Sequence, residues 1–528
     1  DAVPAPAPQQ RKKLGKGFLV PVVLILAGGV IVSQIVKQGG SLEDSARVDK
    51  QRQEAEARHV SNTALHLYSW PNVALSIVHL PTAVYVTGFY SQNLGLSLGA
   101  VGLIILLSRL TDVFTDPVVG ILSDRYNTKW GRRKPWIVAG IPLMVLTVWL
   151  LFVPPAAVFE AGQTWGLVYL AAILILYYLS NTFIDLPYKA WGADLSTDYR
   201  ERSLVTGYRE SYGFLGLILV LAIPVIMTMN GYTKLADWVF GIAVACAISL
   251  PVLFLPALWR VAEPQVEAKP RPEITWARGL KIIWRNGPFM RLVWVGLLLI
   301  TTTSMTAALS LLFVTHAMGQ PKFFPIFVMF YYLASVGGIP LWLAISKRLG
   351  KHKATAMAIF WLSLWSAPIP FVGADQFWIF FALMMLKGSA VGALYFIPAS
   401  MAADVIDIDT LRTGEQRTGL YFAMWGMVLK GAAGIGTALA TAGAGYFGFD
   451  PTCASPALAR EAATCTNTAD SIFALAAFYS IIPAIVALAS VPLLWRYPVT
   501  EERQKKLRAQ IARRNGTAPR AVTAGDLA

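Results

Sequence analysis

The chain has 528 residues, of which 55% are hydrophobic and only 14% are charged. Soluble proteins carry roughly 25% charged residues, so this composition excludes a soluble multidomain enzyme. The net charge of +15 raises nucleic acid or anionic lipid as a partner, and the placement of the charges has to decide.

Apolar stretches of about 20 residues recur along the chain, separated by short polar or basic segments. Helices of this length satisfy their own backbone hydrogen bonds across a bilayer, so the pattern predicts an all-α membrane protein. Twelve spans are predicted, at residues 71–91, 98–122, 135–155, 166–193, 205–229, 236–259, 289–314, 323–345, 354–373, 376–401, 419–442 and 471–495.

The basic residues are distributed asymmetrically over the loops. With the chain before Asn72 in the cytoplasm, nearly all loop and tail Lys and Arg residues lie inside, and only Lys234, Lys322 and Arg460 lie outside. The positive-inside rule therefore predicts an integral membrane protein with a cytoplasmic C-terminus. We expect the membrane to be a bacterial inner membrane. This topology explains the charge, so we expect a lipid bilayer and no nucleic acid as partner.

A thirteenth apolar run, residues 17–36, follows a basic cluster near the N-terminus. A signal peptide is one interpretation, but the run is long for that and no small-residue cleavage site clearly follows it. We therefore prefer an uncleaved extra hydrophobic helix. We expect the protein to be monomeric, with this helix as the element that docks a partner. One added span would place the basic N-terminus outside, so its topology stays open. Residues 39–43 also read as an engineered junction.

Residues 260–288 form the longest inner segment, with Pro264, Pro270, Pro272 and six basic side chains, between six spans and six spans. They predict a linker between two six-helix bundles, at 65–259 and 289–497. An N-terminal extension (1–64) and a basic tail (498–528) complete the predicted organisation. The halves echo each other, because basic motifs follow span two (131–134) and span eight (347–353). Such repetition is typical of secondary transporters.

Two of the three cysteines, Cys453 and Cys465, share the loop between the last two spans. The predicted topology places this loop outside, where thiols oxidise, so we expect a disulfide. Cys246 stands alone in a predicted helix and is interpreted as a small apolar packing residue.

Span two carries a polar stripe. At 100° per residue, Arg109, Asp112, Thr115 and Asp116 share one face of a helix. Each ionised group at the bilayer centre costs roughly 2.5–3.5 kcal/mol, so two carboxylates one turn apart favour a cation or proton site. An Arg109–Asp112 pair that only joins helices is the alternative, and it leaves Asp116 unmatched.

Span four repeats this logic with Thr182, Asp185 and Lys189 at i, i+3 and i+7. Asp185 can accept hydrogen bonds from a polar ligand while Thr182 supplies a neutral oxygen to a cation, or Asp185 and Lys189 form only a local ion pair. Most of the tryptophans are expected in interfacial belts, and Trp191 is the one candidate ligand platform.

Spans five and eleven add further charges. Arg209 and Glu210 lie early in span five, where a cavity-facing charge and a membrane-edge salt bridge are equal alternatives. Lys430 is alone in an apolar span and needs a carboxylate across the cavity. The chain has no Walker motif, HExxH or CxxC. We therefore do not expect an ATP-driven pump or an enzyme. We also expect no cofactor and no metal other than a coupling sodium ion.

These residues resemble the glycoside-pentoside-hexuronide:cation symporters of the major facilitator superfamily, the family of melibiose permease. The resemblance covers about residues 65–500. It rests on the motifs Arg109-x2-Asp112-x3-Asp116-Pro117-x2-Gly120, Ser123-Asp124-Arg125-x4-Trp130-Gly131-Arg132-Arg133-Lys134-Pro135-Trp136, Asp185-x-Pro187 and Lys430-Gly431.

The resemblance implies a major facilitator fold and a role for each matching residue. Asp112, Asp116 and Thr182 would bind the coupling cation, with Thr115 beside them, and whether that ion is Na+ or H+ stays open. Asp185 and Arg209 would contact a sugar. Lys430 would lie near the charged centre with Arg109. The loop with Asp124, Arg125, Arg132 and Arg133 would gate the inner side by binding helix ends of the opposite bundle.

Two departures bear on the substrate. Residues 75–79 lack the sugar-binding aspartate of melibiose permease, and Lys189 replaces its aromatic residue one turn after Asp185. A galactoside is therefore disfavoured, and the added cation suits an acidic substrate such as a hexuronide. Animal relatives of this fold carry lysolipids, so an amphiphilic solute is an alternative. A scaffold or assembly factor on a transporter fold is another, although it would have no need for the buried charges.

Overall fold

The computed structural model describes residues 60–125, 128, 130–196, 199–263, 283–413, 418–453, 465–495 and 497–498. These residues form helices and one isolated bridge, between Thr128 and Gly131, and they contain no strand. The predicted extra helix at 17–36, most of the predicted linker and nearly all of the tail lie outside the described residues.

Twelve helical stretches of the described chain are long and apolar enough to cross a membrane. They are Asn62–Asn93, Leu98–Ser123, Lys134–Phe152, Gln163–Asp194, Leu204–Met229, Leu235–Arg260, Gly287–His316, Pro321–Leu349, Lys351–Phe371, Ala374–Ile406, Tyr421–Tyr446 and Ala469–Trp495. All but the first begin within three residues of the predicted position. The prediction of an all-α membrane protein with twelve spans is confirmed.

The helices of the first six spans form the N-terminal bundle. They are α3 (Asn62–Ser69), α4 (Pro71–Gly88), the π-helical turn η1 (Phe89–Asn93), α5 (Leu98–Leu110), α6 (Asp112–Arg125), α7 (Lys134–Phe152), α8 (Ala156–Glu160), α9 (Gln163–Asp194), α10 (Tyr199–Met229) and α11 (Leu235–Arg260).

The helices of the last six spans form the C-terminal bundle. They are α13 (Gly287–His316), η2 (Pro321–Phe323), α14 (Phe324–Leu349), α15 (Lys351–Ser366), η3 (Ile369–Phe371), η4 (Ala374–Gln376), α16 (Phe377–Thr413), α17 (Thr418–Tyr446), α18 (Ala469–Ala476), the π-helical turn η5 (Ala477–Ile481), α19 (Ile482–Leu488) and α20 (Val491–Trp495).

The first span begins nine residues before its predicted start, because a short helix precedes Pro71. Ser61 caps α3, its side chain accepting a hydrogen bond from the Ala64 N–H at 3.2 Å. Pro71 then opens α4, at a position where its missing N–H costs nothing. The composition of α3 does not predict a membrane span. The helix nevertheless starts at the Ser61 cap and continues through Trp70, which is in the α conformation, into α4.

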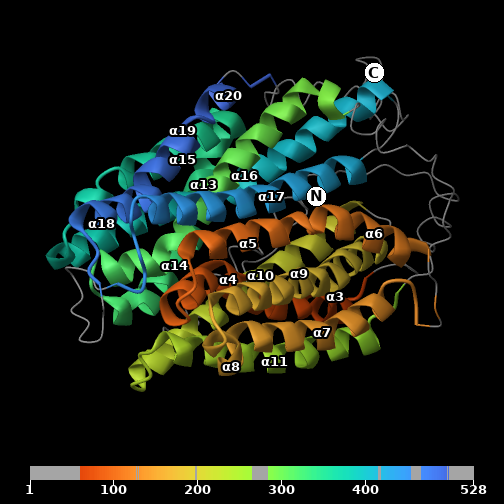
Figure 1. Cartoon of the computed structure of the whole chain (residues 1–528). Coiled ribbons are helices and arrows are strands. Elements are labelled where there is room, and N and C mark those ends of the chain that lie inside the picture. The colour runs from red at the N-terminus through yellow and green to blue at the C-terminus, as the bar shows by residue number, and fades with distance from the viewer. Residues whose placement is uncertain are drawn as a thin grey trace, which may run out of the picture.

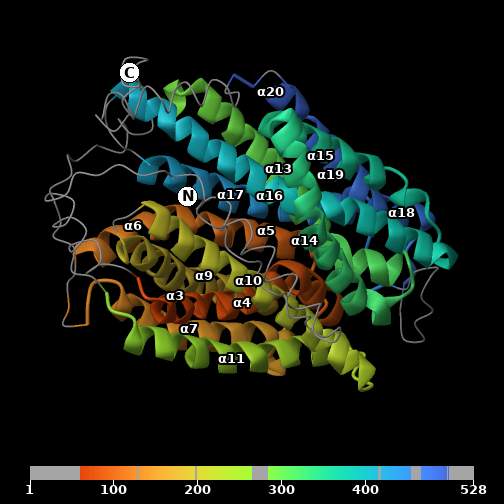
Figure 2. The ribbon, with the colours of Figure 1, turned by 180° about the vertical axis from the view of Figure 1, so that it is seen from behind.

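The two bundles lie side by side, with α5 next to α17 where they meet (Figures 1 and 2). The helix α4 also packs against α13, and α10 packs against α14. Each of these contacts pairs one helix of the first half with one of the second. We call the end of the molecule at Arg132 and Arg133 the basic end, and the opposite end, at Cys453 and Cys465, the disulfide end. Cys453 and Cys465 are bonded to each other.

Close packing between the bundles lies in the half of the spans nearer the disulfide end. Gly102, near the start of α5, lies against Ala438 and Thr441, near the end of α17. Gly88, at the end of α4, lies against Leu311 of α13. The missing side chains let the helices approach, so this conformation is held together at the disulfide end.

Adding one methyl group at Gly102 should disfavour this conformation. A Cβ at Gly102 would lie 2.9 Å from the Thr441 Cβ, whereas one at Gly99 would lie 3.7 Å from the Ala442 Cα, an ordinary contact. We therefore expect Gly102→Ala, and not Gly99→Ala, to shift the protein toward the state that opens at the disulfide end. In alternating access the basic end closes when the disulfide end opens. The shift should therefore reduce maleimide labelling of a cysteine placed at Ser400, which is exposed on α16 in this conformation. Equal labelling in both variants would show that this contact does not set the conformation.

Candidate functional site

The second span is interrupted at its centre. The helix α5 ends at Leu110, and α6 begins at Asp112. Thr111, between them, donates its hydroxyl to the Ser108 carbonyl at 2.6 Å. Asp112 is therefore the first residue of a helix, where the peptide dipoles favour a carboxylate. Asp116 follows one turn later, so both carboxylates lie within the Leu98–Ser123 span.

Lys430 of α17 reaches both carboxylates from the other bundle. Its Nζ lies 2.5 Å from Asp116 Oδ2 and 3.3 Å from Asp112 Oδ2. Only 2% of the Asp112 side chain and 23% of the Lys430 side chain are exposed. This buried cluster thus joins the N-terminal bundle to the C-terminal bundle through charge.

The cluster has oxygen atoms to spare for a second cation. Thr182 donates its hydroxyl to Asp116 Oδ1 at 2.8 Å. Within the described residues, neither oxygen of Asp112 accepts a hydrogen bond, and the buried hydroxyl of Thr115 also has no hydrogen-bond partner. Carboxylate and hydroxyl oxygens are the ligands that hard cations prefer. The structure brings Asp112 and Asp116 together around the Lys430 ammonium, and it bonds Thr182 to Asp116.

Arg109 lies at the edge of this cluster. Its Nη1 is 3.9 Å from Asp112 Oδ2, and its guanidinium lies over the ring of Tyr178, 4.3 Å from the ring centroid. A cation over an aromatic face is stabilised by the ring quadrupole. Tyr178 therefore orients Arg109 beside Asp112. Asp116, which Arg109 does not contact, is paired with Lys430.

Asp185 and Lys189 form an ion pair one turn apart on α9, 2.7 Å between Nζ and Oδ2. The carboxylate is mostly buried, with 13% of the side chain exposed, whereas 51% of the Lys189 side chain is exposed. The local pair is thus present, as one of the two sequence-based interpretations expected. The exposed ammonium still leaves donors free for a ligand.

Arg209 pairs with its neighbour Glu210 at 2.7 Å, and its own side chain is largely buried. Asn72 of α4 donates to the Arg209 carbonyl at 2.8 Å, which fixes this turn of α10 against α4. Arg209 therefore lies in the bundle interior, and Glu210, half-exposed, provides its counter-charge.

The structure does not bring Trp191 to this site. Its ring is fully buried, packs edge-on against Tyr68, and donates its indole N–H to the Ala262 carbonyl at 3.2 Å. A side chain that fills the bundle interior cannot serve as a platform for a ligand in this conformation. We therefore remove Trp191 from the candidate substrate site.

The basic loop between α6 and α7 contacts its own bundle. Arg132 and Arg133 both lie beside Asp194 Oδ2 at the end of α9, at 3.4 and 3.7 Å. Arg133 also donates to the Ser123 hydroxyl at 2.9 Å. The structure describes the backbone of Asp124 and Arg125 but not their side chains. Gating through helix ends of the opposite bundle stays a prediction.

Glu263, at the first residues of the linker, caps the start of α7. Its Oε1 accepts the backbone N–H groups of Arg132 and Arg133 at 2.7 and 2.9 Å, and its Oε2 accepts that of Lys134 at 3.2 Å. The first N–H groups of a helix have no partner within the helix, so one carboxylate satisfies three of them. The linker is thereby fastened to the basic loop.

Sequence reasoning missed Asp194, Glu263 and Lys387. The first two act through contacts distant in sequence, which no local pattern reveals. Lys387, in contrast, had a clear signal as a lysine inside an apolar span. It is 1% exposed, with its Nζ 3.4 Å from the Thr306 hydroxyl and 5.4 Å from the ring centroid of Tyr479. It is a second buried ammonium, placed inside the C-terminal bundle.

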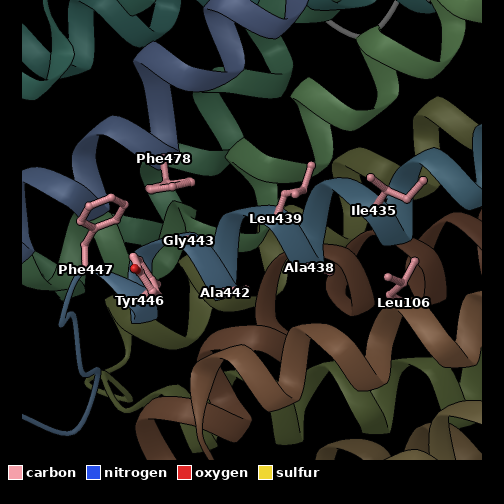
Figure 3. A pocket seen from close by; sticks show the side chains of 9 residues that line it. All are labelled: Leu106, Ile435, Ala438, Leu439, Ala442, Gly443, Tyr446, Phe447 and Phe478. Atoms are coloured by element: carbon pink, nitrogen blue, oxygen red, sulfur yellow. The ribbon is translucent and has the colours of Figure 1, made fainter.

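A groove of about 600 Å³ lies along α17 (Figure 3). Its lining residues are Leu106, Ile435, Ala438, Leu439, Ala442, Gly443, Tyr446, Phe447 and Phe478. None of them carries a charge that could orient a polar substrate. The groove is therefore not part of the candidate site.

Two six-helix bundles joined by a buried charge cluster define a membrane transporter that works by alternating access. The chain belongs to the MFS/sugar transport protein family, whose profile matches residues 67–501. The predicted major facilitator relationship is thereby confirmed.

Similar proteins include a bacterial symporter and an animal lysophosphatidylcholine symporter. The chain is 25% identical over 456 residues to the inner membrane symporter YicJ of Escherichia coli, covering 84% of this chain and 94% of that protein. It is also 25% identical over 445 residues to the human sodium-dependent lysophosphatidylcholine symporter 1, covering 76% and 77%. Among solved structures, the nucleoside transporter NupG matches with a TM-score of 0.53 at 14% identity, over 82% of this chain and 99% of that one. This likeness supports the fold.

Removing the Glu263 carboxylate should loosen the basic loop. Leaving buried donors without partners costs about 1–3 kcal/mol, so we expect Glu263→Ala to destabilise the purified protein by about that amount. Glu263→Gln retains one acceptor oxygen and should cost less. Thermal unfolding in detergent measures both, with Glu160→Ala, on the short helix α8, as a control. A stability of Glu263→Ala equal to that of the control would show that the cap does not hold the loop.

Proposed function

We propose that this protein is a cation-coupled symporter of a sugar or glycoside, with Na+ or H+ as coupling ion and an acidic glycoside such as a hexuronide as favoured substrate. It moves its substrate without chemical change and is not an enzyme. The observation that carries the proposal is the Asp112–Asp116–Thr182 oxygen cluster, bridged by Lys430 from the opposite bundle. The sugar is supported by the family to which the chain belongs.

The cluster suggests how ion and substrate are coupled. Lys430 and Arg109 together now compensate the two carboxylates, and a bound cation would compete with the Lys430 ammonium for the same oxygens. Breaking a buried pair without replacement costs about 3–5 kcal/mol, so Lys430 is released cheaply only when another cation arrives. The coupling ion would therefore loosen the charge link between the bundles and permit their rearrangement.

The substrate would contact Asp185, Lys189 and Arg209. Asp185 accepts hydrogen bonds from hydroxyls, while the two cations donate to hydroxyls or to an anionic group. The exposed ammonium of Lys189 favours an acidic substrate. A lysolipid or other amphiphile is the second candidate, favoured by the likeness to the lysophosphatidylcholine symporter.

We also propose that the basic end faces the cytoplasm, with the C-terminus on that side of a bacterial inner membrane. The asymmetry of the loop charges supports this orientation. The protein would work as a monomer, with the hydrophobic segment at 17–36 as the element that docks a partner. A scaffold without transport is tested by the same uptake experiment as the main proposal.

Neutralising either carboxylate should abolish gradient-driven uptake. The experiment measures uptake of neutral glycosides, glucuronides and lysophosphatidylcholine into proteoliposomes with an imposed Na+ or H+ gradient. We expect Asp112→Asn and Asp116→Asn to reduce accumulation at least tenfold, because each loses one charged ligand of the coupling ion.

Asp375→Asn, in η4 at the disulfide end, is the matched control and should transport normally. Undiminished coupled uptake by both site variants would refute the cation site. Absence of gradient-linked uptake of every solute by the wild type would leave the scaffold as the better explanation.

Replacing Lys189 by Trp should separate acidic from neutral substrates. If the Lys189 ammonium binds an anionic group, Lys189→Trp should weaken the binding of a glucuronide by about 1–3 kcal/mol more than the binding of the matching glucoside. This difference is the contribution of one charge-assisted hydrogen bond. Competition for uptake gives both affinities. Equal losses of affinity for both would mean that Lys189 only neutralises Asp185. A neutral sugar or a lipid would then be the better candidate substrate.

A further inference from the structure

His79 presents a polar ring on the most buried of the twelve spans. The helix α4 packs against α10 and α11 of its own bundle and against α13 of the other, yet the His79 side chain is exposed. A helix enclosed in this way is open only toward the space between the bundles. His79 therefore faces the region in which the substrate is proposed to bind.

The neighbours of His79 place it between the two elements of the proposed substrate site. His79 lies seven residues after Asn72, on the same helix face, and Asn72 is bonded to the turn that carries Arg209. The His79 ring is hydrogen-bonded to Asn181 of α9, with 2.7 Å between Nε2 and Oδ1. Asn181 lies one turn before Asp185. The ring thus bridges α4 to the turn of α9 that leads to the Asp185–Lys189 pair.

We propose that His79 is a specificity-determining residue that accepts a hydrogen bond from a substrate hydroxyl, with Asn181 as its positioning residue. This inference rests on the proposed transport function. An amide oxygen only accepts, so the Nε2 that meets Asn181 Oδ1 carries the hydrogen. In the neutral ring Nδ1 then holds a lone pair, and no described residue donates to it.

This lone pair differs from the other acceptors of the site. Asp185 is already paired with Lys189, and Asp112 and Asp116 are paired with Lys430. A neutral imidazole accepts a hydroxyl without adding a charge that would have to be compensated. His79 therefore recognises hydroxyl-bearing substrates, and its ring is held in place by Asn181 whatever the charge of the substrate.

The simpler alternative is a bridge that only joins α4 to α9. A structural bridge would affect all substrates equally, whereas a hydroxyl acceptor affects only those that carry the hydroxyl. The comparison of a substrate with its deoxy analogue therefore separates the two roles. A neutral hydrogen bond changes affinity by about three- to tenfold.

The experiment measures uptake of phenyl β-D-glucuronide and its monodeoxy analogues, and of lysophosphatidylcholine and its analogue without the glycerol hydroxyl, into proteoliposomes. We expect the wild type to prefer one parent over a deoxy analogue by about three- to tenfold. His79→Phe, which keeps a ring but has no nitrogen, should bring that ratio close to one while still transporting the deoxy analogue. Asn181→Leu should reduce the ratio partly.

His66→Phe is the matched control, because the His66 ring lies on the short helix α3 and is bonded to Tyr212 instead of Asn181. It should leave the ratio unchanged. An unchanged ratio in His79→Phe, or an equal loss for parent and analogue, would overturn the role of His79 while leaving the transport function standing. A wild type that transports none of these solutes would overturn the proposed function, and the inference with it.

A second measurement does not depend on a variant that folds. Diethyl pyrocarbonate modifies accessible histidine nitrogens, so mass spectrometry of the native protein should find His79 modified, and the transported parent glycoside or lysolipid should protect it. His316, fully buried, is the internal reference and should stay unmodified. Failure of His79 to react, or reaction that is unaffected by saturating substrate, would also overturn the inference.

Discussion

Charge compensation inside the membrane is the constraint on which the rest of this structure depends. Two carboxylates one turn apart cannot remain ionised in hydrocarbon without a cation, at roughly 2.5–3.5 kcal/mol for each charge. The structure meets this demand with Arg109 of the same span and with Lys430, which belongs to the other bundle. The interaction that neutralises the site is thus also one that joins the two halves of the molecule. Any cation that replaces Lys430 changes the contact between the bundles, which is what coupled transport requires.

The contacts near the disulfide end are of a different kind. Glycines at 88 and 102 allow helices of the two bundles to touch without side chains between them. Such packing depends on shape and is indifferent to ions, whereas the Lys430 cluster depends on charge. The ion therefore acts on one contact and leaves the other intact. Opening at the disulfide end would have to part these glycine contacts, so release of the charged link removes one of the two kinds of contact that hold this conformation.

Much of the architecture could be predicted from the sequence because membranes impose simple rules. Hydropathy gives the number of spans, and charge asymmetry gives the expected orientation. The i, i+4 spacing of Asp112 and Asp116 by itself indicates a shared helix face. The lone Lys430 in an apolar span also indicated a carboxylate across the cavity, and the resemblance placed it near the charged centre. Only the packing of the two bundles shows that its partners are Asp112 and Asp116.

Contacts formed by loops and by bent helices were the least predictable. Glu263 caps α7 through backbone groups, which carry no sequence signature. The short helix α3 depends on the Ser61 cap and on Pro71, and its composition gives little sign of a membrane span. Trp191 is on a helix that lines the site, but its own face points into the bundle. Helix periodicity gives relative positions on a face, and only the packing decides which face is inward.

The two bundles divide the chemistry of the site unequally. Across the described spans of the C-terminal bundle, the only acidic side chains lie toward the helix ends, at Asp375, Asp404 and Asp470. The same bundle contributes two buried ammonium groups, Lys387 and Lys430. Within these described spans, all carboxylates deep in the membrane therefore come from the N-terminal bundle. On the proposed function, the N-terminal bundle would therefore bind the coupling cation and the hydroxyls of a substrate. The C-terminal bundle supplies Lys430, which compensates the two carboxylates together with Arg109 of the N-terminal bundle, so the charge balance of the site depends on both bundles.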